Sequence, residues 1–142
     1  MNTKLDVKQW AIASVAVFVV LSILAFLSIR LEESIFTGLV LRPETTQDTT
    51  MLRVWNYLGR LIFSLVFVLV YTKGIGGKSA LVEGLRYGFW MGLLMPLSGF
   101  FASLVGTTWP TSFLVTNGLV GLVTFVIAGI TAGLLYKKPV GS

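Results

Sequence analysis

The sequence predicts an all-α fold in which four helices cross a membrane as one bundle. Four long apolar stretches divide the 142-residue chain, and each approaches the roughly 20 residues that a helix needs to span a bilayer. Hydrophobic residues make up 55% of the chain and charged residues 12%, against about 25% charged residues in a soluble domain. So few charges cannot cover the surface of so short a chain, and lipid is therefore its expected solvent.

The predicted spans cover residues 10–30, 52–72, 85–106 and 113–136, within a single membrane domain that takes in the whole chain. Lys4 and Lys8 precede the first span, as they would precede a signal peptide. Its apolar core of about 20 residues exceeds the ~7–15 of a signal peptide, which favours a retained span. The only sizeable connection, residues 31–51, contains a polar, threonine-rich stretch.

The positions of Lys and Arg predict the orientation of the spans. One side of the membrane carries seven of these cations, namely Lys4, Lys8, Lys73, Lys78, Arg86, Lys137 and Lys138, and the other carries Arg30, Arg42, Arg53 and Arg60. Positive residues are enriched on the cytoplasmic side. Both termini are therefore expected in the cytoplasm (N-in, C-in), with residues 31–51 outside, in a bacterial cytoplasmic (inner) membrane. Trp10, Trp55, Trp90 and Trp109 fall near span ends, as an aromatic belt does.

Small residues recur at four-residue spacing on the third and fourth spans. The two stripes consist of Gly84, Gly88 and Gly92, and of Gly129 and Gly133. Such faces let helix backbones approach closely in lipid. The simpler interpretation is a tight contact within the bundle, and the alternative is a face for self-association or for a partner. Pro96 removes one helix hydrogen bond and predicts a kink in the third span.

Polar side chains inside the spans are the candidate functional residues. Arg60 lies about 12 Å below the outer boundary, where an unpaired arginine costs a few kcal/mol. Asn56 and Ser64 share its helix face. Possible partners at a similar depth are Asn117 in the fourth span and Glu32 and Glu33 at the outer end of the first. We expect a cluster in the external half of the bundle, which either fixes helix register or forms a substrate or ion site open to the outside.

Several classes of function are not expected. The chain has no cysteine and no histidine, so thiolate and histidine metal sites are excluded, and we predict neither metal nor cofactor. The scattered cations form no patch for nucleic acid. Gly77-Lys78-Ser79 resembles the end of a phosphate-binding loop, but Thr72 stands where its first glycine should be. The preceding apolar run has the length of a span and not of a strand, so nucleotide binding is not expected.

Two stretches, YTKGIGGKSALVEGLRYGFWMGLLM (71–95) and AGITAGLLYKK (128–138), resemble small four-span bacterial membrane proteins of uncharacterised function. This resemblance implies a four-helix integral membrane protein and supplies no catalytic residue. We therefore predict a non-enzymatic accessory or structural subunit, embedded in the lipid bilayer and packed in a homo-oligomer or against a larger membrane complex. The alternative is a small transporter or channel with an outward-facing polar site around Arg60.

Overall fold

The computed structural model describes residues 5–37, 49–76 and 79–136. They form four helices, α1 (Val7–Ile35), α2 (Thr49–Lys73), α3 (Ala80–Gly106) and α4 (Thr111–Leu135). All four are long and apolar enough to cross a membrane, so the predicted all-helical, four-span character is confirmed. The N-in, C-in orientation stays a prediction.

Each helix begins before its predicted span, and α1 and α2 also end after theirs. α1 continues to Ile35, so Glu32 and Glu33 belong to the helix and not to a loop. Of the predicted external segment, residues 38–48 lie outside the described residues, and so does Gly77-Lys78 of the stretch that resembles a phosphate loop. We call the end of the molecule at the α3–α4 turn the outer end, and the end at the α2–α3 turn the inner end.

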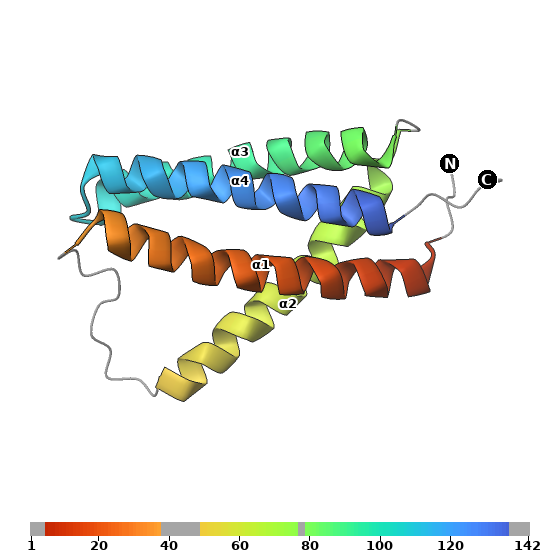
Figure 1. Cartoon of the computed structure of the whole chain (residues 1–142), viewed down its shortest axis with the longest axis horizontal. Helices are drawn as coiled ribbons and strands as arrows, with labels where there is room; N and C mark the ends of the chain where they lie inside the picture. Colours follow the sequence, from red (N-terminus) through yellow and green to blue (C-terminus); the bar gives the residue numbers. More distant parts are fainter. Residues whose placement is uncertain (1–4, 38–48, 77–78, 137–142) are drawn as a thin grey trace.

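α3 and α4 form a hairpin joined by the short turn 107–110 (Figure 1). Gly84, Gly88 and Gly92 are the buried residues of α3. A Cβ added to Gly84 would collide with the backbone of Gly129, and one added to Gly129 would collide with Gly84 and Gly88. The structure thus places both glycine stripes in the contact between these two helices.

α3 is a single helix on both sides of Pro96. The proline ring lies against Gly121 of α4, where an added Cβ would come within 2.9 Å of the ring Cγ. A glycine on the facing helix therefore makes room for the proline. At the inner end, Glu83 closes the α2–α3 turn, because its Oε1 accepts a hydrogen bond of 2.7 Å from the backbone N–H of Gly76.

α1 lies alongside α4, whereas α2 crosses the other three helices at a steep angle (Figure 1). Asp6 caps α1 by accepting a hydrogen bond from the N–H of Gln9 (3.0 Å). The N–H of Asp6 donates to the Tyr136 hydroxyl (3.3 Å), which joins the start of α1 to the end of α4.

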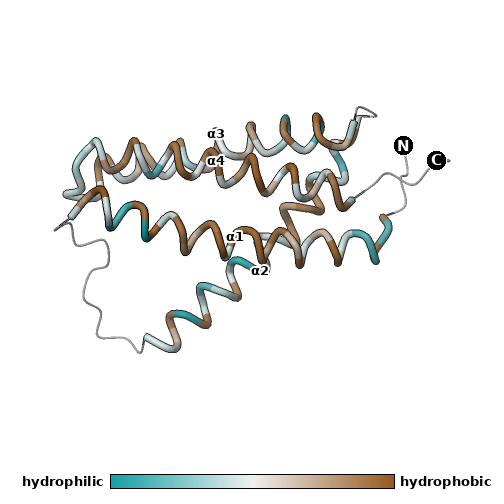
Figure 2. Tube along the Cα trace, in the orientation of Figure 1, coloured by the Kyte–Doolittle hydropathy of each residue, from teal (hydrophilic) through white to brown (hydrophobic). Residues whose placement is uncertain are grey.

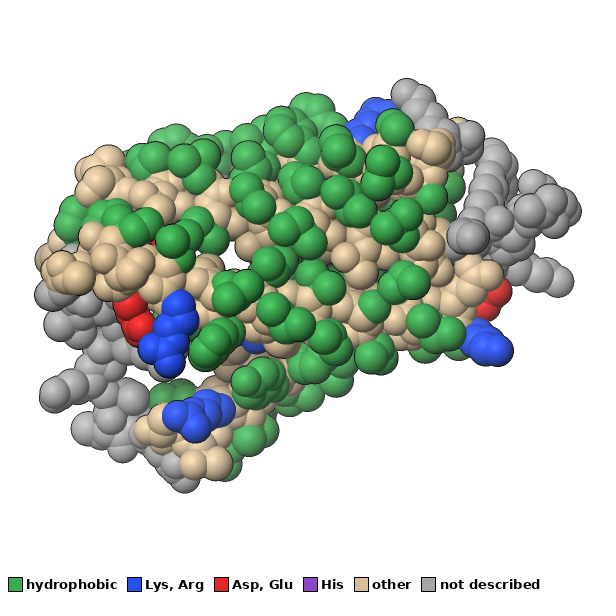
Figure 3. Space-filling model, in the orientation of Figure 1, with side chains coloured by type: hydrophobic (Ala, Val, Ile, Leu, Met, Phe, Trp, Pro, Cys, Tyr) green, Lys and Arg blue, Asp and Glu red, His purple; other side chains and the backbone are tan. Residues whose placement is uncertain are grey.

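The buried core gathers around the inner half of α2. It consists of Ala13, Val17, Leu21, Phe67, Val68, Tyr71, Ala128, Ala132 and Tyr136. Hydrophobic residues recur along the helices (Figure 2), many large ones among them are exposed, and hydrophobic side chains cover most of the visible face (Figure 3). Such a surface fits lipid better than water.

Candidate functional site

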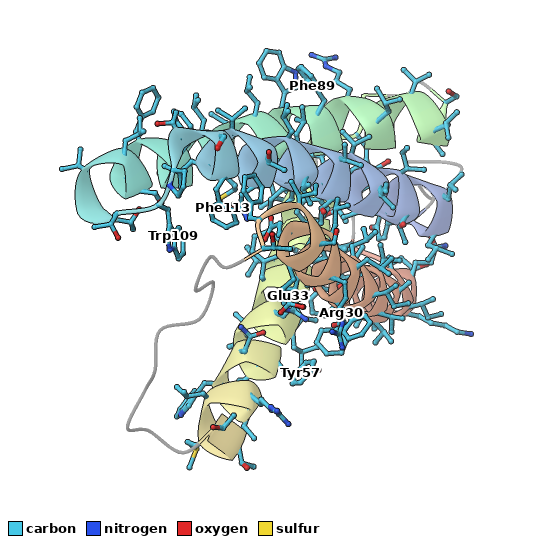
Figure 4. The ribbon with its side chains drawn as sticks, turned by 60° about the vertical axis from the view of Figure 1, so that its left-hand side comes forward. Arg30, Glu33, Tyr57, Phe89, Trp109 and Phe113 are labelled. Atoms are coloured by element: carbon cyan, nitrogen blue, oxygen red, sulfur yellow. The ribbon has the colours of Figure 1, made fainter. Side chains whose placement is uncertain are left out.

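The first half of α2 stands away from the rest of the molecule (Figures 1 and 4). All residues from Thr49 to Gly59 are exposed except Leu52, which is half-buried. Trp55 is 63% exposed. We call residues 49–60 the outer arm of α2. In the described part of the chain, no second helix packs along the whole arm, and the contact with α1 is confined to its inner end, where Tyr57 meets Phe18.

Arg60 ends the outer arm and forms its polar contacts within α2. Its Nη2 donates a hydrogen bond of 2.9 Å to Oδ1 of Asn56. Its Cζ lies 5.7 Å from the centroid of the Tyr57 ring, a cation–π distance. Both contacts lie one turn toward the start of α2, so the guanidinium points toward the outer end. Among the described residues Arg60 takes part in no ion pair.

Ser64 extends this polar stripe into the core. It is fully buried, and its Oγ donates a hydrogen bond of 2.8 Å to the carbonyl of Arg60. Asn56, Arg60 and Ser64 thus occupy one face of α2, as their i, i+4 spacing predicts. Because Ser64 is buried, only Asn56, which is exposed, and Arg60, which is half-buried, have side chains that a second molecule can reach.

The depth of Arg60 follows from two contacts between the antiparallel helices α1 and α2. The ring of Tyr57 meets that of Phe18 edge-on, with centroids 6.5 Å apart. The indole Nε1 of Trp10 donates to the carbonyl of Leu65 (3.1 Å). Arg60 lies between these two contacts along α2, and therefore at a level between Trp10 and Phe18 on α1. This level falls in the inner half of α1 and not near its outer end.

Glu32 and Asn117 form a separate polar pair at the outer end. The Glu32 side chain is buried, with 5% of the residue exposed, and its Oε1 accepts a hydrogen bond of 2.9 Å from Nδ2 of Asn117. The nearby rings of Phe36 and Phe113 meet edge-on at 5.3 Å. These contacts join the outer end of α1 to the start of α4.

The predicted cluster is therefore divided in the structure. About 21 Å of α1 separate Phe18 from Glu32, at ~1.5 Å per residue. Glu33 is exposed and pairs with Arg30 at 3.6 Å (Figure 4). Arg60 and Glu32 are apart because α2 is slanted relative to α1. The two helices touch beside the inner half of α1, and the outer arm of α2 diverges from the outer half of α1.

The residues that join α2 to α1 and α3 are not among the predicted site residues. The sequence places Trp10 in an aromatic belt, whereas in the structure its indole N–H also forms a hydrogen bond from α1 to α2. The Tyr87 hydroxyl similarly donates to the carbonyl of Phe67 (2.7 Å), joining α3 to α2. Buried Tyr and Trp usually find a hydrogen-bond partner for the polar end of the ring, which was the available signal.

The chemistry that these groups offer is anion or carboxylate recognition. A guanidinium provides five N–H donors, and Asn56 adds an amide beside it. Groups of three or more His, Cys, Asp or Glu side chains arranged to hold a metal are absent from residues 5–37, 49–76 and 79–136.

Comparisons of the chain with protein-family models, with characterised proteins and with solved structures give no match. The resemblance to small four-span bacterial membrane proteins therefore stays a prediction.

Proposed function

We propose that the protein is a non-enzymatic accessory subunit of a bacterial inner-membrane complex, and that it docks through the outer arm of α2. The observation that carries this proposal is the exposed polar face of the arm. Arg53 and Asn56 are exposed on it, and half-buried Arg60 has no acidic partner among the described residues. In a soluble protein such a face would be hydrated. Because α2 has the length and apolarity of a membrane span, the same face would here lie among lipid chains unless a partner covers it.

The energetics of helices in lipid favour an occupant for this face. A charged side chain near the middle of a span costs a few kcal/mol unless it is paired or reaches the interface. Helix association in lipid depends on close packing and on interhelical hydrogen bonds, typically worth ~0.6–2 kcal/mol each. A partner helix along the arm supplies both, whereas lipid chains supply neither hydrogen bonds nor charge.

The glycine stripes are not the docking face of this proposal. Gly84, Gly88 and Gly129 are buried between α3 and α4 and have no surface left for a partner. The outward face of α3 presents mainly aliphatic and aromatic side chains, such as Leu94, which is 62% exposed. That surface suits lipid, so α3 provides a matched control for the outer arm.

Site-specific photo-crosslinking in native membranes tests the docking surface. A photoreactive amino acid replaces Arg53, which shares the polar face of the outer arm with Asn56 and Arg60, or Leu94 on α3, and both positions are exposed. We expect discrete adducts of defined mass from position 53 and only diffuse lipid adducts from position 94. Recovery of the protein as a monomer without adducts from position 53 would contradict the accessory role.

A small transporter or channel is the second candidate, and one observation favours it. The outer arm and the outer half of α1 diverge (Figure 4), so α1 does not cover the polar face of the arm. Arg60 and Asn56 lie where the two helices meet, beside the ring contact of Tyr57 with Phe18. An anion entering from the outer end would reach the guanidinium there.

Water access separates the two candidates. The chain has no cysteine, so the variant Asn56→Cys carries a single thiol. Rapid reaction of this thiol with a charged, membrane-impermeant reagent would favour the transporter. A thiol that is protected in native membranes, and that reacts once the protein is purified away from its partner, supports docking.

A further inference from the structure

We infer that the outer arm recognises a transmembrane helix of a different protein that carries an Asp or Glu carboxylate at the depth of Arg60. This inference rests on the proposed docking function and names the chemistry of the partner. Its basis is threefold: Arg60 has no acidic partner among the described residues, it lies deep along α1, and the acids of the described residues lie at the ends of the molecule.

The guanidinium of Arg60 has N–H donors without a hydrogen-bond partner among the described residues, and its contacts within α2 hold it toward the outer end. Of the five guanidinium N–H donors, one is used on Asn56 Oδ1. The Tyr57 ring lies under the guanidinium and limits its rotation. A planar guanidinium held in this way suits a carboxylate, which accepts two parallel hydrogen bonds from it. Asn56 Nδ2 lies beside the same position and can donate to the same acid.

Lipid phosphate is a poor alternative because of the depth of Arg60. Phe18 lies at or above the level of Arg60, and 17 residues of α1 follow it, about 25 Å of helix. The guanidinium points toward that distant outer end and away from the nearer, inner one. The hydrocarbon core is about 30 Å thick, so the outer phosphates lie beyond the reach of the side chain. A carboxylate on a neighbouring helix can be placed at any depth.

Among the described residues, a second copy of the chain offers no acid at the level of Arg60. Copies inserted with the same orientation hold each residue at the same depth, so the acid has to lie at the level of Arg60. The four acids of the described residues lie at the ends of the molecule: Asp6 and Glu83 at the inner end, Glu32 and Glu33 at the outer end. Glu32 also accepts from Asn117, and Glu33 pairs with Arg30.

A designed helix serves as the probe for this chemistry. It is a Leu/Ala peptide of about 21 residues with a single central Glu, and matched peptides carry Gln or Leu at that position. The full-length protein carries a fluorescent donor on Ser34→Cys, at the exposed outer end of α1. Energy transfer to an acceptor on the peptide is measured in phosphatidylcholine vesicles at mildly alkaline pH, which favours the ionised carboxyl.

We expect the Glu peptide to associate at least about tenfold more tightly than the Leu peptide, a difference of the size that interhelical polar contacts give. Arg60→Leu should abolish the difference, and Arg53→Leu, near the start of the arm, should preserve it. The hydrogen bond and the cation–π contact of the Arg60 side chain both lie within α2, so we expect this variant to fold. An unchanged helical circular dichroism spectrum and elution volume check the fold.

Four results would overturn the inference: equal binding of the Glu and Leu peptides, binding that survives Arg60→Leu, Arg60-dependent transfer between two copies of the protein, or loss of the effect in phosphatidylglycerol vesicles. The last two would assign the acid to a second copy and to lipid phosphate. Adducts from position 53 in native membranes without any preference for the Glu peptide would refute the carboxylate and leave the docking role standing. Absence of those adducts would refute the docking role itself.

Discussion

At the scale of single residues, the close approach of α3 and α4 depends on missing side chains. Gly88 faces the backbone of Phe125 and Val126, and no Cβ fits between them. Gly99, on the same helix beyond Pro96, has nothing within 4 Å of the position that a Cβ would take. Two glycines of one helix therefore differ completely in what they contribute, although the sequence alone makes them look alike.

The variant Gly88→Ala should destabilise the protein, because its Cβ would lie 2.8 Å from the Cα of Val126 and force the two helices apart. We expect a loss of about 1–3 kcal/mol in the free energy of unfolding, the range for overpacked cores. Titration with a denaturing detergent measures it. Gly99→Ala is the matched control and should leave the stability unchanged or slightly raised, since alanine favours the helix by up to ~1 kcal/mol. Equal losses in both variants would contradict the packing described for α3.

A second residue-scale prediction concerns the pair of Glu32 and Asn117. Asn117→Leu removes the donor and leaves a buried carboxylate without its hydrogen bond, which should cost about 1–3 kcal/mol. The double variant Glu32→Leu/Asn117→Leu should recover part of that loss, because no polar group is then left unpaired. Stability measured over this double-mutant cycle checks the coupling, and strictly additive losses would show that the pair is not coupled.

At the scale of elements, the sequence predicts helix existence well and helix arrangement poorly. Apolar length is a property of each stretch by itself, and so the four helices were predicted. The spacing of Gly84, Gly88 and Gly92 likewise marks a packing face. The slant of α2 depends on distant contacts, such as Trp10 with Leu65 and Tyr87 with Phe67, which no local pattern specifies. That slant is why Arg60 lies away from Glu32 and Asn117.

The two unlike halves of α2 lead to a prediction about local stability. Its inner half is buried around Phe67 and Tyr71, whereas the outer arm has few neighbours. Few buried contacts mean a low free energy of local opening. In detergent, the amide hydrogens of residues 49–59 should therefore exchange at least about tenfold faster than those of residues 64–71. Hydrogen exchange followed by mass spectrometry measures this, and equal rates would mean that the arm is held by contacts of its own.

At the scale of the whole molecule, an even number of spans places the α2–α3 turn at the same end as the start of α1 and the end of α4 (Figure 1). The hydrogen bond between Asp6 and Tyr136 links the first and last helices at this end. The excess of Lys and Arg predicts that it faces the cytoplasm. The orientation matters for function, because it decides from which side of the membrane the outer arm is reached.

Two single-cysteine variants test the orientation, since the chain has no cysteine of its own. Thr107→Cys lies at the outer end and Ser79→Cys at the inner end, and both positions are exposed. In intact cells, a membrane-impermeant thiol reagent should label position 107 and leave position 79 unlabelled until the membrane is opened. The reverse pattern would place the termini outside and overturn the N-in, C-in prediction.

The hydrogen bond between Glu32 and Asn117 also bears on the order of events during synthesis. Its two residues are 85 positions apart, so α1 emerges from the ribosome long before its partner exists. At about 5–20 residues per second, the carboxylate waits roughly 4–17 s for the amide. During that time Glu32 lacks this hydrogen-bond partner, so its carboxyl group depends on water, lipid headgroups or other proteins for hydrogen bonds. The last helix to be synthesised thus supplies the hydrogen-bond partner of the first. If synthesis stops before α4, Glu32 of α1 is left without the amide of Asn117.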